Sequence, residues 1–316
     1  MGQYAAFTTD AGFVDLGHRT QVEVTGDDRA TLLNNFCTND IQRLTPGTGC
    51  EAFIASGKGR VLAHVQVFSG ESSLVLETAP GQAAAIIEHL ERYTIREDAK
   101  FVDHTDQWSE LLLNGSEVAA KLSDLGCENV PVAPAHHATN LIADIEVSLR
   151  RTEMVSPRGI LLSCPTDSIE TVADALENAG VRRCDPVIHE TCRIEAGWPE
   201  HGRDITDQNL PQEVNRDDRT ISFTKGCYLG QETVARIDAL GHVNRQLVTL
   251  QFESTDPPPP GMEILHDGKS VGSVTSSAYS PANETALAFA YVRSPFAKPG
   301  AELDSDTGRA VVLPKN

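Results

Sequence analysis

The chain has 316 residues, of which 40% are hydrophobic, and a formal net charge of −19 at pH 7. This length allows more than one buried core, and no apolar run approaches the ~18 residues that cross a bilayer, so we expect a globular protein away from the membrane. An acidic surface repels nucleic acid at long range, and direct nucleic-acid binding is therefore not expected.

Cysteine usage and the first residues favour a reducing compartment. The seven cysteines are an odd number, lie scattered along the chain and form no C-x-x-C pair. This arrangement disfavours a disulfide framework and a zinc ribbon, and we expect no bound metal. The chain begins without a basic stretch followed by an apolar core, which disfavours a secretory signal. We therefore predict a cytoplasmic protein with free thiols.

Four strand–helix units recur along the first 180 residues. In each unit an apolar strand pattern leads through a turn rich in Gly, Asp, Asn or Pro into an amphipathic helix. The predicted strands are 21–25, 73–78, 111–113 and 159–163, and the helices that follow them are 29–36, 82–93, 117–125 and 168–178. Further strand-like runs lie at 61–68, 99–102 and 146–149. The pattern predicts an α+β fold with helices packed on antiparallel or mixed sheets.

The glycine-rich stretch 56–60, Ser-Gly-Lys-Gly-Arg, has the composition of a loop. Two interpretations are open, a nest of backbone N–H groups that binds an anion and a plain hairpin turn, of which the turn is the commoner. Neither a Walker A sequence nor a G-x-G-x-x-G segment after a strand is present, which disfavours a nucleotide-binding fold.

Four consecutive prolines, Pro257 to Pro260, mark a boundary near the C-terminus. Because such a run fits neither a helix nor a sheet, we predict a stiff, extended connector. Residues 246–252 alternate as a strand before it, and short strands with turn signals at 267–268 and 306–308 follow it. Residues 246–316 are thus predicted to form a small antiparallel barrel or sandwich, with its first strand ahead of the prolines.

The segment 225–232, Lys-Gly-Cys-Tyr-Leu-Gly-Gln-Glu, carries the strongest chemical signal. Its two glycines permit a tight turn, and residues 232–237 are predicted to begin a helix. The N–H groups of such a turn, the helix N-terminus and the Lys225 ammonium all favour the thiolate form of Cys227. Cys227 and Lys225 are therefore our candidate catalytic residues. The alternative is that Cys227 is a small buried hydrophobic residue.

This segment resembles the signature of the YgfZ-type proteins, which are folate-binding relatives of the glycine-cleavage T protein, an aminomethyltransferase. The resemblance extends upstream through 193–197 (Arg-Ile-Glu-Ala-Gly) and 210–213 (Leu-Pro-Gln-Glu), and downstream through 241–245 (Gly-His-Val-Asn-Arg). It implies a cloverleaf around a tetrahydrofolate site. Two interwoven α/β domains of ferredoxin-like character would occupy 1–245, and a small C-terminal antiparallel β-barrel 246–316.

The resemblance also implies which residues contact the folate. The relatives use an acid shortly after their Arg-x-Glu-x-Gly block, and Asp204 occupies the matching position. A buried carboxylate there would pair with the donor edge of a reduced pterin. The alternative is that Asp204 caps a turn. The further folate-binding candidates in the matching motifs are Glu213, Tyr228, Gln231, Glu232 and Arg236.

One departure from the T-protein pattern bears on activity. Aminomethyltransferases carry an Asp pair in the strand after a Gly-Gly turn, where this chain has Ala63 and His64. An imidazole moves protons but places no fixed negative charge beside a developing cation. Aminomethyl transfer as in glycine cleavage is therefore disfavoured, and we leave open whether the chain is an enzyme.

Three functions are open at this point. The first, implied by the YgfZ-type resemblance, is a folate-binding factor that supports assembly or repair of iron–sulfur enzymes, including tRNA-modifying ones, through Cys227. Its partners would be iron–sulfur proteins or their assembly factors. The second is a tetrahydrofolate-dependent one-carbon transferase. The third is a non-catalytic folate-sensing scaffold.

Overall fold

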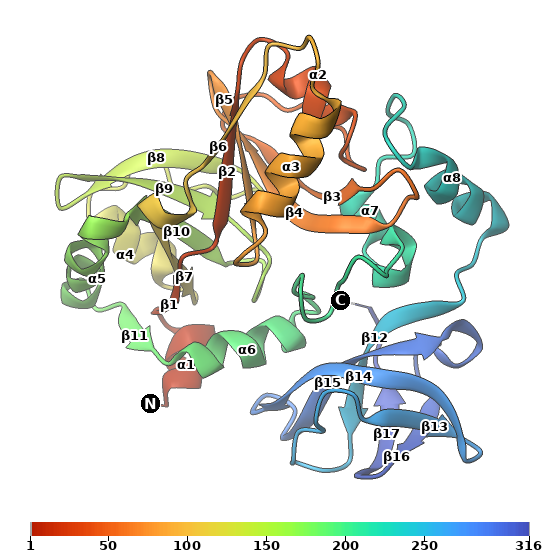
Figure 1. Cartoon of the computed structure of the whole chain (residues 1–316). Coiled ribbons are helices and arrows are strands. Elements are labelled where there is room, and N and C mark those ends of the chain that lie inside the picture. Colours follow the sequence, from red (N-terminus) through yellow and green to blue (C-terminus); the bar gives the residue numbers. More distant parts are fainter. Residues whose placement is uncertain (1, 316) are drawn as a thin grey trace.

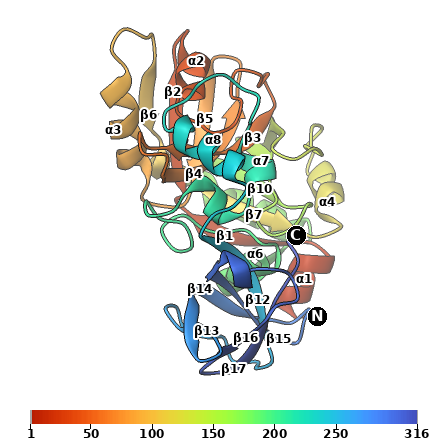
Figure 2. The same cartoon turned by 90° about the vertical axis from the view of Figure 1, so that its right-hand side faces the viewer.

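The computed structural model describes residues 2–315. Two β-sheets with helices packed on them are followed by a closed antiparallel barrel (Figures 1 and 2). The predicted α+β class and the C-terminal antiparallel barrel are confirmed. The division into independently folding parts at 1–245 and 246–316 stays a prediction.

The first sheet has six strands in the order β11-β1-β7-β10-β9-β8. They are β1 (Gly12–Gly17), β7 (Trp108–Asn114), β8 (His137–Ile142), β9 (Ile145–Arg151), β10 (Ile160–Pro165) and β11 (Arg182–Cys184). Neighbouring strands are antiparallel except β1 and β11, which are parallel. Helices α4 (Val118–Asp124) and α5 (Ile169–Asn178) bury their apolar sides with those of this sheet in one core.

The second sheet is inserted between β1 and β7, so the two sheets are interwoven. Its order is β3-β4-β5-β2-β6, and every neighbouring pair is antiparallel. The strands are β2 (Thr20–Thr25), β3 (Gly49–Ala55), β4 (Val61–Ser69), β5 (Ser73–Thr78) and β6 (Lys100–Asp103). Helices α2 (Arg29–Asn34) and α3 (Ala83–Tyr93) share its core. The stretch 56–60 is the turn between β3 and β4, as its composition predicted.

The barrel closes in the order β12-β15-β14-β13-β16-β17. Its strands are β12 (Arg245–Phe252), β13 (Glu263–His266), β14 (Lys269–Ser280), β15 (Thr285–Arg293), β16 (Glu302–Ser305) and β17 (Gly308–Val312). The proline connector lies between β12 and β13, so the first strand of the barrel precedes the prolines, as predicted. Cutting the chain at the prolines would therefore remove β12 from its partners β15 and β17.

The remaining helices lie between the sheets and the barrel or beside the second sheet (Figure 1). They are α1 (Gln3–Thr9), α6 (Pro186–Glu195), α7 (Asp217–Thr220) and α8 (Gln231–Leu240), with 3-10 turns η1 (Thr105–Gln107), η2 (Thr166–Ser168), η3 (Pro211–Val214) and η4 (Ser294–Phe296). Helix α6 begins at a proline, and its N-cap Asp185 accepts a hydrogen bond from the backbone of Val187. Among the helices of residues 2–315, none has the length and apolar character needed to span a bilayer.

Strand β15 joins the barrel to the rest of the chain through its alternating side chains. Ala288, Ala290 and Val292 point into the barrel core. Phe289 and Tyr291 face outward and pack with apolar residues of β3, β4 and α6. We call the contact between this outer barrel face and those elements the barrel seam.

Candidate functional site

Strand β4 presents its side chains alternately to the core of the second sheet and to the junction of the three parts. Ala63 and Val65 lie in the core with α2 and α3, whereas His64 and Gln66 line a small cavity at the junction. Of the two residues that replace the acidic pair, only His64 therefore points toward the junction, beside Gln66 and Trp198.

His64 is held by Glu51 of the neighbouring strand β3. Its Nε2 lies 2.7 Å from Oε1 of Glu51, and Arg216 donates to both oxygens of Glu51 at 2.6 and 2.7 Å. Burial alone would raise the pKa of Glu51, but the charges and hydrogen bonds of Arg216 and His64 outweigh burial and hold that pKa well below its usual range. Because an ionised carboxylate only accepts, the His64 Nε2 carries a hydrogen.

The indole of Trp198 packs against this cluster. The guanidinium carbon of Arg216 lies 4.6 Å from a ring centroid of Trp198, and the imidazole of His64 lies 5.3 Å from it, centroid to centroid. All three side chains are buried. Water is therefore largely excluded from the Glu51–His64–Arg216 cluster, and its charges are screened less than surface charges are.

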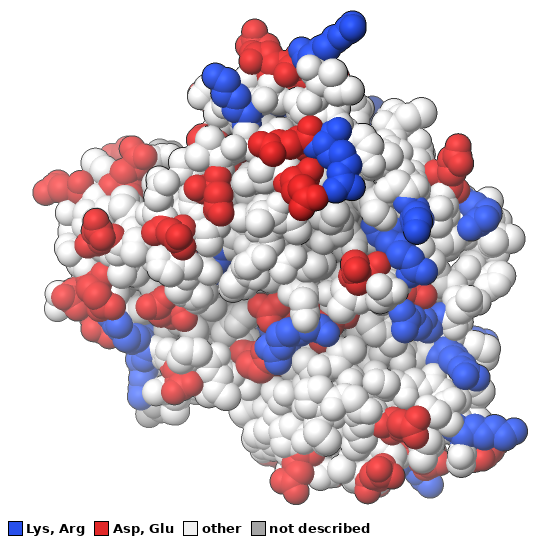
Figure 3. All heavy atoms as spheres, in the orientation of Figure 1, with Lys and Arg blue, Asp and Glu red and all other residues white. Residues whose placement is uncertain are grey.

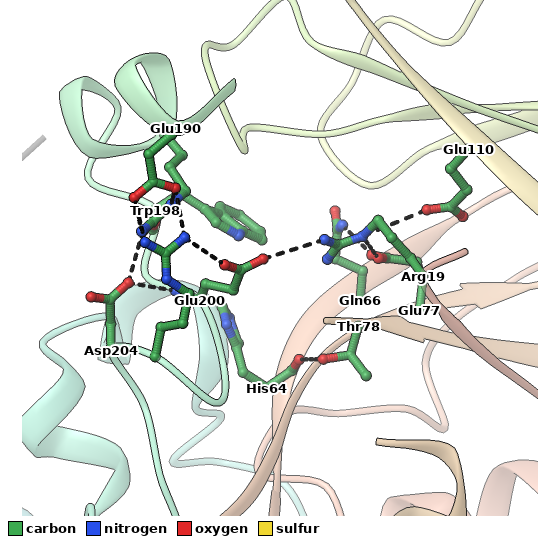
Figure 4. Close-up of polar contacts among 12 residues, drawn as sticks. Arg19, His64, Gln66, Glu77, Thr78, Glu110, Glu190, Trp198, Glu200 and Asp204 are labelled. Carbon is green, nitrogen blue, oxygen red and sulfur yellow. Dashed lines mark hydrogen bonds and ion pairs between the residues drawn. The ribbon is translucent and has the colours of Figure 1, made fainter. Parts of the chain in front are cut away.

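A second charged group lies beside His64 and links the two sheets (Figure 4). Arg19 donates to Glu77 of β5 at 2.5 Å and lies 3.6 Å from Glu110 of β7. Gln66 donates to the other oxygen of Glu77 at 2.7 Å, and Arg150 donates to Glu110 at 3.0 Å. Burial and the charge of Glu77 raise the pKa of Glu110 against the opposing effect of the two arginines. These buried charges tie β5 to β7.

Glu200 continues this group toward α6 (Figure 4). Its carboxylate lies 3.7 Å from Arg19 and 3.4 Å from Arg203. Arg203 in turn donates to both oxygens of Glu190 at 2.8 Å. A continuous set of ion pairs therefore crosses the junction next to His64.

The role of Asp204 as the pterin anchor stays a prediction, and in the structure its carboxylate is engaged by protein donors. Its Oδ2 accepts from Arg193 at 2.7 Å and from the backbone N–H of Glu200 at 3.0 Å. Its Oδ1 accepts from the hydroxyls of Thr275 and Ser276, each at 2.6 Å. The side chain has no exposed surface, and both oxygens are occupied by protein donors. Asp204 closes a turn, as the alternative held, and also fastens the barrel seam.

Two cavities lie next to the Glu51–His64–Arg216 cluster. One, of about 210 Å³, is lined by Glu51, Gln66, Arg151 and Trp198 among others. The second, of about 290 Å³, has apolar walls from Val155, Pro157 and Ala196, together with the carboxylate of Glu195 and the guanidinium of Arg216. Glu153 and Arg219, which form an ion pair, line both cavities. The two cavities therefore adjoin, and we call them together the junction cavities.

Glu195 is positioned from two directions. The hydroxyl of Tyr4 lies 2.8 and 3.0 Å from its two oxygens, and Ser280 of the barrel donates to Oε1 at 2.5 Å. These contacts fix the carboxylate between α1 and the barrel, at the wall of the larger junction cavity.

The catalytic role of Lys225 also stays a prediction, and in the structure its ammonium fastens a loop. Its Nζ donates to three backbone carbonyls, those of Asn34, Cys37 and Asn39, each at 2.7 Å. The residue is buried, and burial lowers its pKa. All three hydrogens of the ammonium are thus used to fasten the loop to the second sheet, and the same ammonium lies 5.1 Å from the ring of Tyr228.

Cys227 lies exposed on that fastened loop. The other six cysteines are buried or half-buried, and all seven are free thiols. Cys227 lines neither of the junction cavities. The alternative that it is a buried hydrophobic residue is therefore wrong, and the thiol is presented to solvent rather than to the junction.

The other motif residues are not gathered at the junction cavities. Tyr228 is buried with Ile221 and Val234, and burial raises its pKa to about 12. Gln231, Glu232 and Arg236 lie on α8, with Glu232 and Arg236 exposed.

Glu213 is likewise away from the junction cavities. Its carboxylate accepts from the backbone of Leu210 at 3.2 Å and pairs with Arg245 at 3.3 Å. For these five residues the folate contact that the resemblance implies stays a prediction.

Most of the residues that line the junction cavities do not belong to the sequence motifs. Glu51, Trp198 and Arg216 carried no signal that sequence patterns could detect. Glu195 carries such a signal, because it lies in the Arg-Ile-Glu-Ala-Gly block on which the resemblance rests. The resemblance nevertheless implies Asp204, further along the chain, as the acid that contacts the pterin.

Comparisons with known proteins agree with this architecture over most of the chain. Residues 2–225 match the model of the GCVT N-terminal domain, and residues 245–314 match that of the glycine cleavage T-protein C-terminal barrel domain. A protein of Natronomonas pharaonis named "Probable aminomethyltransferase" is 29% identical, covering 95% of this chain and 84% of its own length. An aminomethyltransferase of Streptomyces coelicolor is 28% identical, covering 95% and 83%.

Among solved structures, the glycine cleavage system aminomethyltransferase T from Bartonella henselae is similar in fold. It superimposes with a TM-score of 0.88, covers 98% of this chain and 87% of its own, and is 19% identical. At that identity the likeness concerns the arrangement of the three parts.

Proposed function

Because the chain belongs to the glycine cleavage T-protein family, we propose that it binds a reduced folate in the junction cavities and takes part in one-carbon transfer. Proteins named aminomethyltransferase are among the relatives that it resembles over nearly its whole length. The observation that carries the proposal is the Glu51–His64–Arg216 cluster beside those cavities.

The residues around the junction cavities fit tetrahydrofolate. A reduced pterin is flat, carries an edge of hydrogen-bond donors and continues into an anionic tail. Val155, Pro157 and Ala196 offer apolar walls, and Glu195 offers an acceptor for the donor edge. For the tail, Arg151 lines the smaller cavity, and its buried Nε has no hydrogen-bond partner among residues 2–315.

His64 is the residue that moves a proton in this proposal. When bound, the folate supplies the ring nitrogens that carry a one-carbon unit. Glu51 accepts the hydrogen on Nε2 of His64 and is itself fixed by Arg216, so the imidazole keeps one tautomer whose Nδ1 can accept a proton. The ionised Glu51 also stabilises the imidazolium that forms.

Glu51 supplies a negative charge close to the position of the missing acidic pair. The loss of both acids from β4 argued against transfer, because an imidazole alone supplies no negative charge. In the folded chain that charge is present behind His64, 2.7 Å from its Nε2. The departure in β4 is therefore compatible with one-carbon transfer, although the substrate that accepts the unit need not be that of glycine cleavage.

Turnover of labelled methylene-tetrahydrofolate tests the transfer. Replacing His64 by Ala should lower the rate by at least ~100-fold, the size of a lost proton-transfer group. His104 offers a matched control, because it pairs with Glu23 at 3.1 Å in a similar way but away from the junction cavities. The His104→Ala variant should turn over normally. Folate binding without any turnover by the wild type would contradict transfer and favour the sensing scaffold.

A second candidate function rests on Cys227. Among the seven cysteines only this thiol is exposed, and the loop beneath it is fastened by Lys225. A partner protein can reach such an exposed thiol. A YgfZ-type protein that supports iron–sulfur enzymes would need this access. A strain carrying Cys227→Ser should lose iron–sulfur enzyme activity if this function holds, whereas Cys50→Ser should not. Equal activity in the two strains would contradict it.

A further inference from the structure

A cleft of about 470 Å³ lies away from the junction cavities, on the outer side of the barrel seam. Strands β14 and β15 and the start of β12 form one wall, and residues 203–209 form the other. It shares no lining residue with either junction cavity. The carboxylate of Asp204 is also part of the lining, with its oxygens bonded to Arg193 and to hydroxyls of the barrel.

Two arginines of the cleft are cross-strand neighbours. Arg245 of β12 and Arg293 of β15 are directly opposite one another in the antiparallel register, so both side chains leave the same face. Like charges in that position destabilise a sheet. Glu213 reaches only Arg245, at 3.3 and 3.4 Å. Among residues 2–315, Arg293 has no ion-pair partner.

A third arginine faces the pair from the opposite wall. Arg203 lines the cleft and lies half exposed, although Glu190 and Glu200 engage part of its guanidinium. Basic residues are not spread evenly over this acidic chain. Figure 3 shows Lys and Arg gathered on the right-hand side of the molecule, over α8 and the adjoining part of the barrel, while Asp and Glu dominate the left.

Tyr291 adds a hydrogen-bond donor without a partner. It lines the cleft on the same face as Arg293, is 8% exposed, and its hydroxyl has no hydrogen-bond partner in residues 2–315. Burial and the nearby Glu213 raise its pKa, so the hydroxyl stays protonated. The guanidinium of Arg245 lies 4.9 Å from the ring centroid of Tyr291. A buried donor without a partner is costly unless a ligand engages it.

We propose that this cleft binds the diphosphate group of a small molecule, held by Arg245, Arg293 and the hydroxyl of Tyr291. Guanidinium groups bind phosphate oxygens in pairs of hydrogen bonds, and the anion would relieve the repulsion between the opposed arginines. The lining is rich in donors and nearly free of apolar side chains, which favours a phosphate over an apolar ligand. Because Arg203 belongs to the opposite wall, the ligand would also bridge the barrel seam.

Titration of the full-length protein with pyrophosphate tests the proposal, by calorimetry and by thermal unfolding. We expect saturable binding and a midpoint of unfolding that rises with pyrophosphate concentration, since a ligand that binds only the folded state stabilises it. Adenosine diphosphate, titrated in parallel, distinguishes a free diphosphate from one carried on an organic group. Tighter binding of either compound supports the site and identifies the source of its phosphates.

Two variants locate the binding, and a third serves as control. Tyr291→Phe should weaken pyrophosphate binding about tenfold but leave the unfolding midpoint without ligand unchanged, because the lost hydroxyl has no partner. Arg293→Gln should weaken it about tenfold too. Arg309→Gln changes an exposed barrel arginine that pairs with Glu302 and should bind as the wild type does. No saturable binding, or equal affinity in all three variants, would overturn the proposal.

Discussion

Gly59 and Gly230 pack backbone against backbone. A Cβ on Gly230 would lie 2.7 Å from the Cα of Gly59 and 2.4 Å from the carbonyl oxygen of Ser56. A Cβ on Gly59 would lie 2.6 Å from that of Thr233. Both glycines have positive φ, +71° and +82°. The two glycine-rich stretches of the sequence thus meet, and their contact holds the loop of Cys227 on the turn between β3 and β4.

We predict that Gly230→Ala destabilises the protein by at least about 2 kcal/mol, because the methyl group meets backbone and the residue must keep positive φ. Gly241→Ala is the matched control. Its φ is +71° but nothing lies within 4 Å of the added Cβ, so only the conformational cost of about 1 kcal/mol applies. Urea unfolding of both variants gives the comparison. Equal losses would show that the contact between the glycines contributes nothing.

The second prediction concerns Asp204. Asp204→Asn leaves Arg193 buried without its counter-charge and places an NH₂ group among donors, so the free energy of unfolding should fall by about 3 kcal/mol or more. The exposed neighbour provides a control, and Asp207→Asn should stay within about 0.5 kcal/mol of the wild type. If the Asp204→Asn variant instead remained stable and lost tetrahydrofolate affinity, the result would support the role of Asp204 as the pterin anchor.

A third prediction is the pH dependence of Asp217, in the first turn of α7. Burial, with smaller effects of neighbouring carboxylates, raises its pKa from 3.8 to about 6, and its Oδ1 has no partner among residues 2–315. Because the folded state holds the proton more tightly, the stability that this group contributes is present below pH ~4 and is lost as the pH rises to ~6.

Replacing Asp217 by Asn should remove that change and raise stability at pH 7 by about 1–2 kcal/mol, after allowance for solvent screening. Urea unfolding at a series of pH values from 4 to 7 measures it. Asp207 is exposed and is not among the charges that act on Asp217, so Asp207→Asn should leave the profile of the wild type intact. A profile that Asp217→Asn does not alter would contradict the assignment.

Labelling with iodoacetamide should modify Cys227 first. Burial raises the pKa of Cys37 and of Cys164 to about 12, so those thiols stay protonated as well as covered. Peptide mapping should find one early adduct, absent from Cys227→Ser. Saturating tetrahydrofolate should not slow the reaction, since Cys227 lines neither junction cavity. Slower labelling with folate would instead bring the thiol and the ligand together.

The sequence predicts the strands and the barrel well because their signals are local. The alternation of β4 and the turns of the barrel can be recognised within a few residues. It predicts the site less well because the partners are remote. The carbonyl of Asn34, which accepts from Lys225, is 191 residues away from it in the sequence.

The partners of Asp204 are remote in the same way. Its chemistry as a buried carboxylate was inferred correctly, but Ser276, which occupies one of its oxygens, lies 72 residues further along the chain. Sequence motifs name the residue types that a site needs, whereas only the fold tells which carboxylate is already saturated. Glu195, within the Arg-Ile-Glu-Ala-Gly block, contacts Tyr4 and Ser280 and also lines the larger junction cavity.

The central claim, folate binding at the junction, is tested most directly by calorimetric titration with tetrahydrofolate of the wild type, Glu195→Gln and Glu232→Gln. The wild type should bind one equivalent. Glu195→Gln should bind at least about tenfold more weakly, as expected for losing a charged acceptor of the pterin edge. Glu232→Gln, changed on the exposed side of α8, should match the wild type. Unchanged affinity in Glu195→Gln with loss in Glu232→Gln, or no binding by the wild type, would contradict the account.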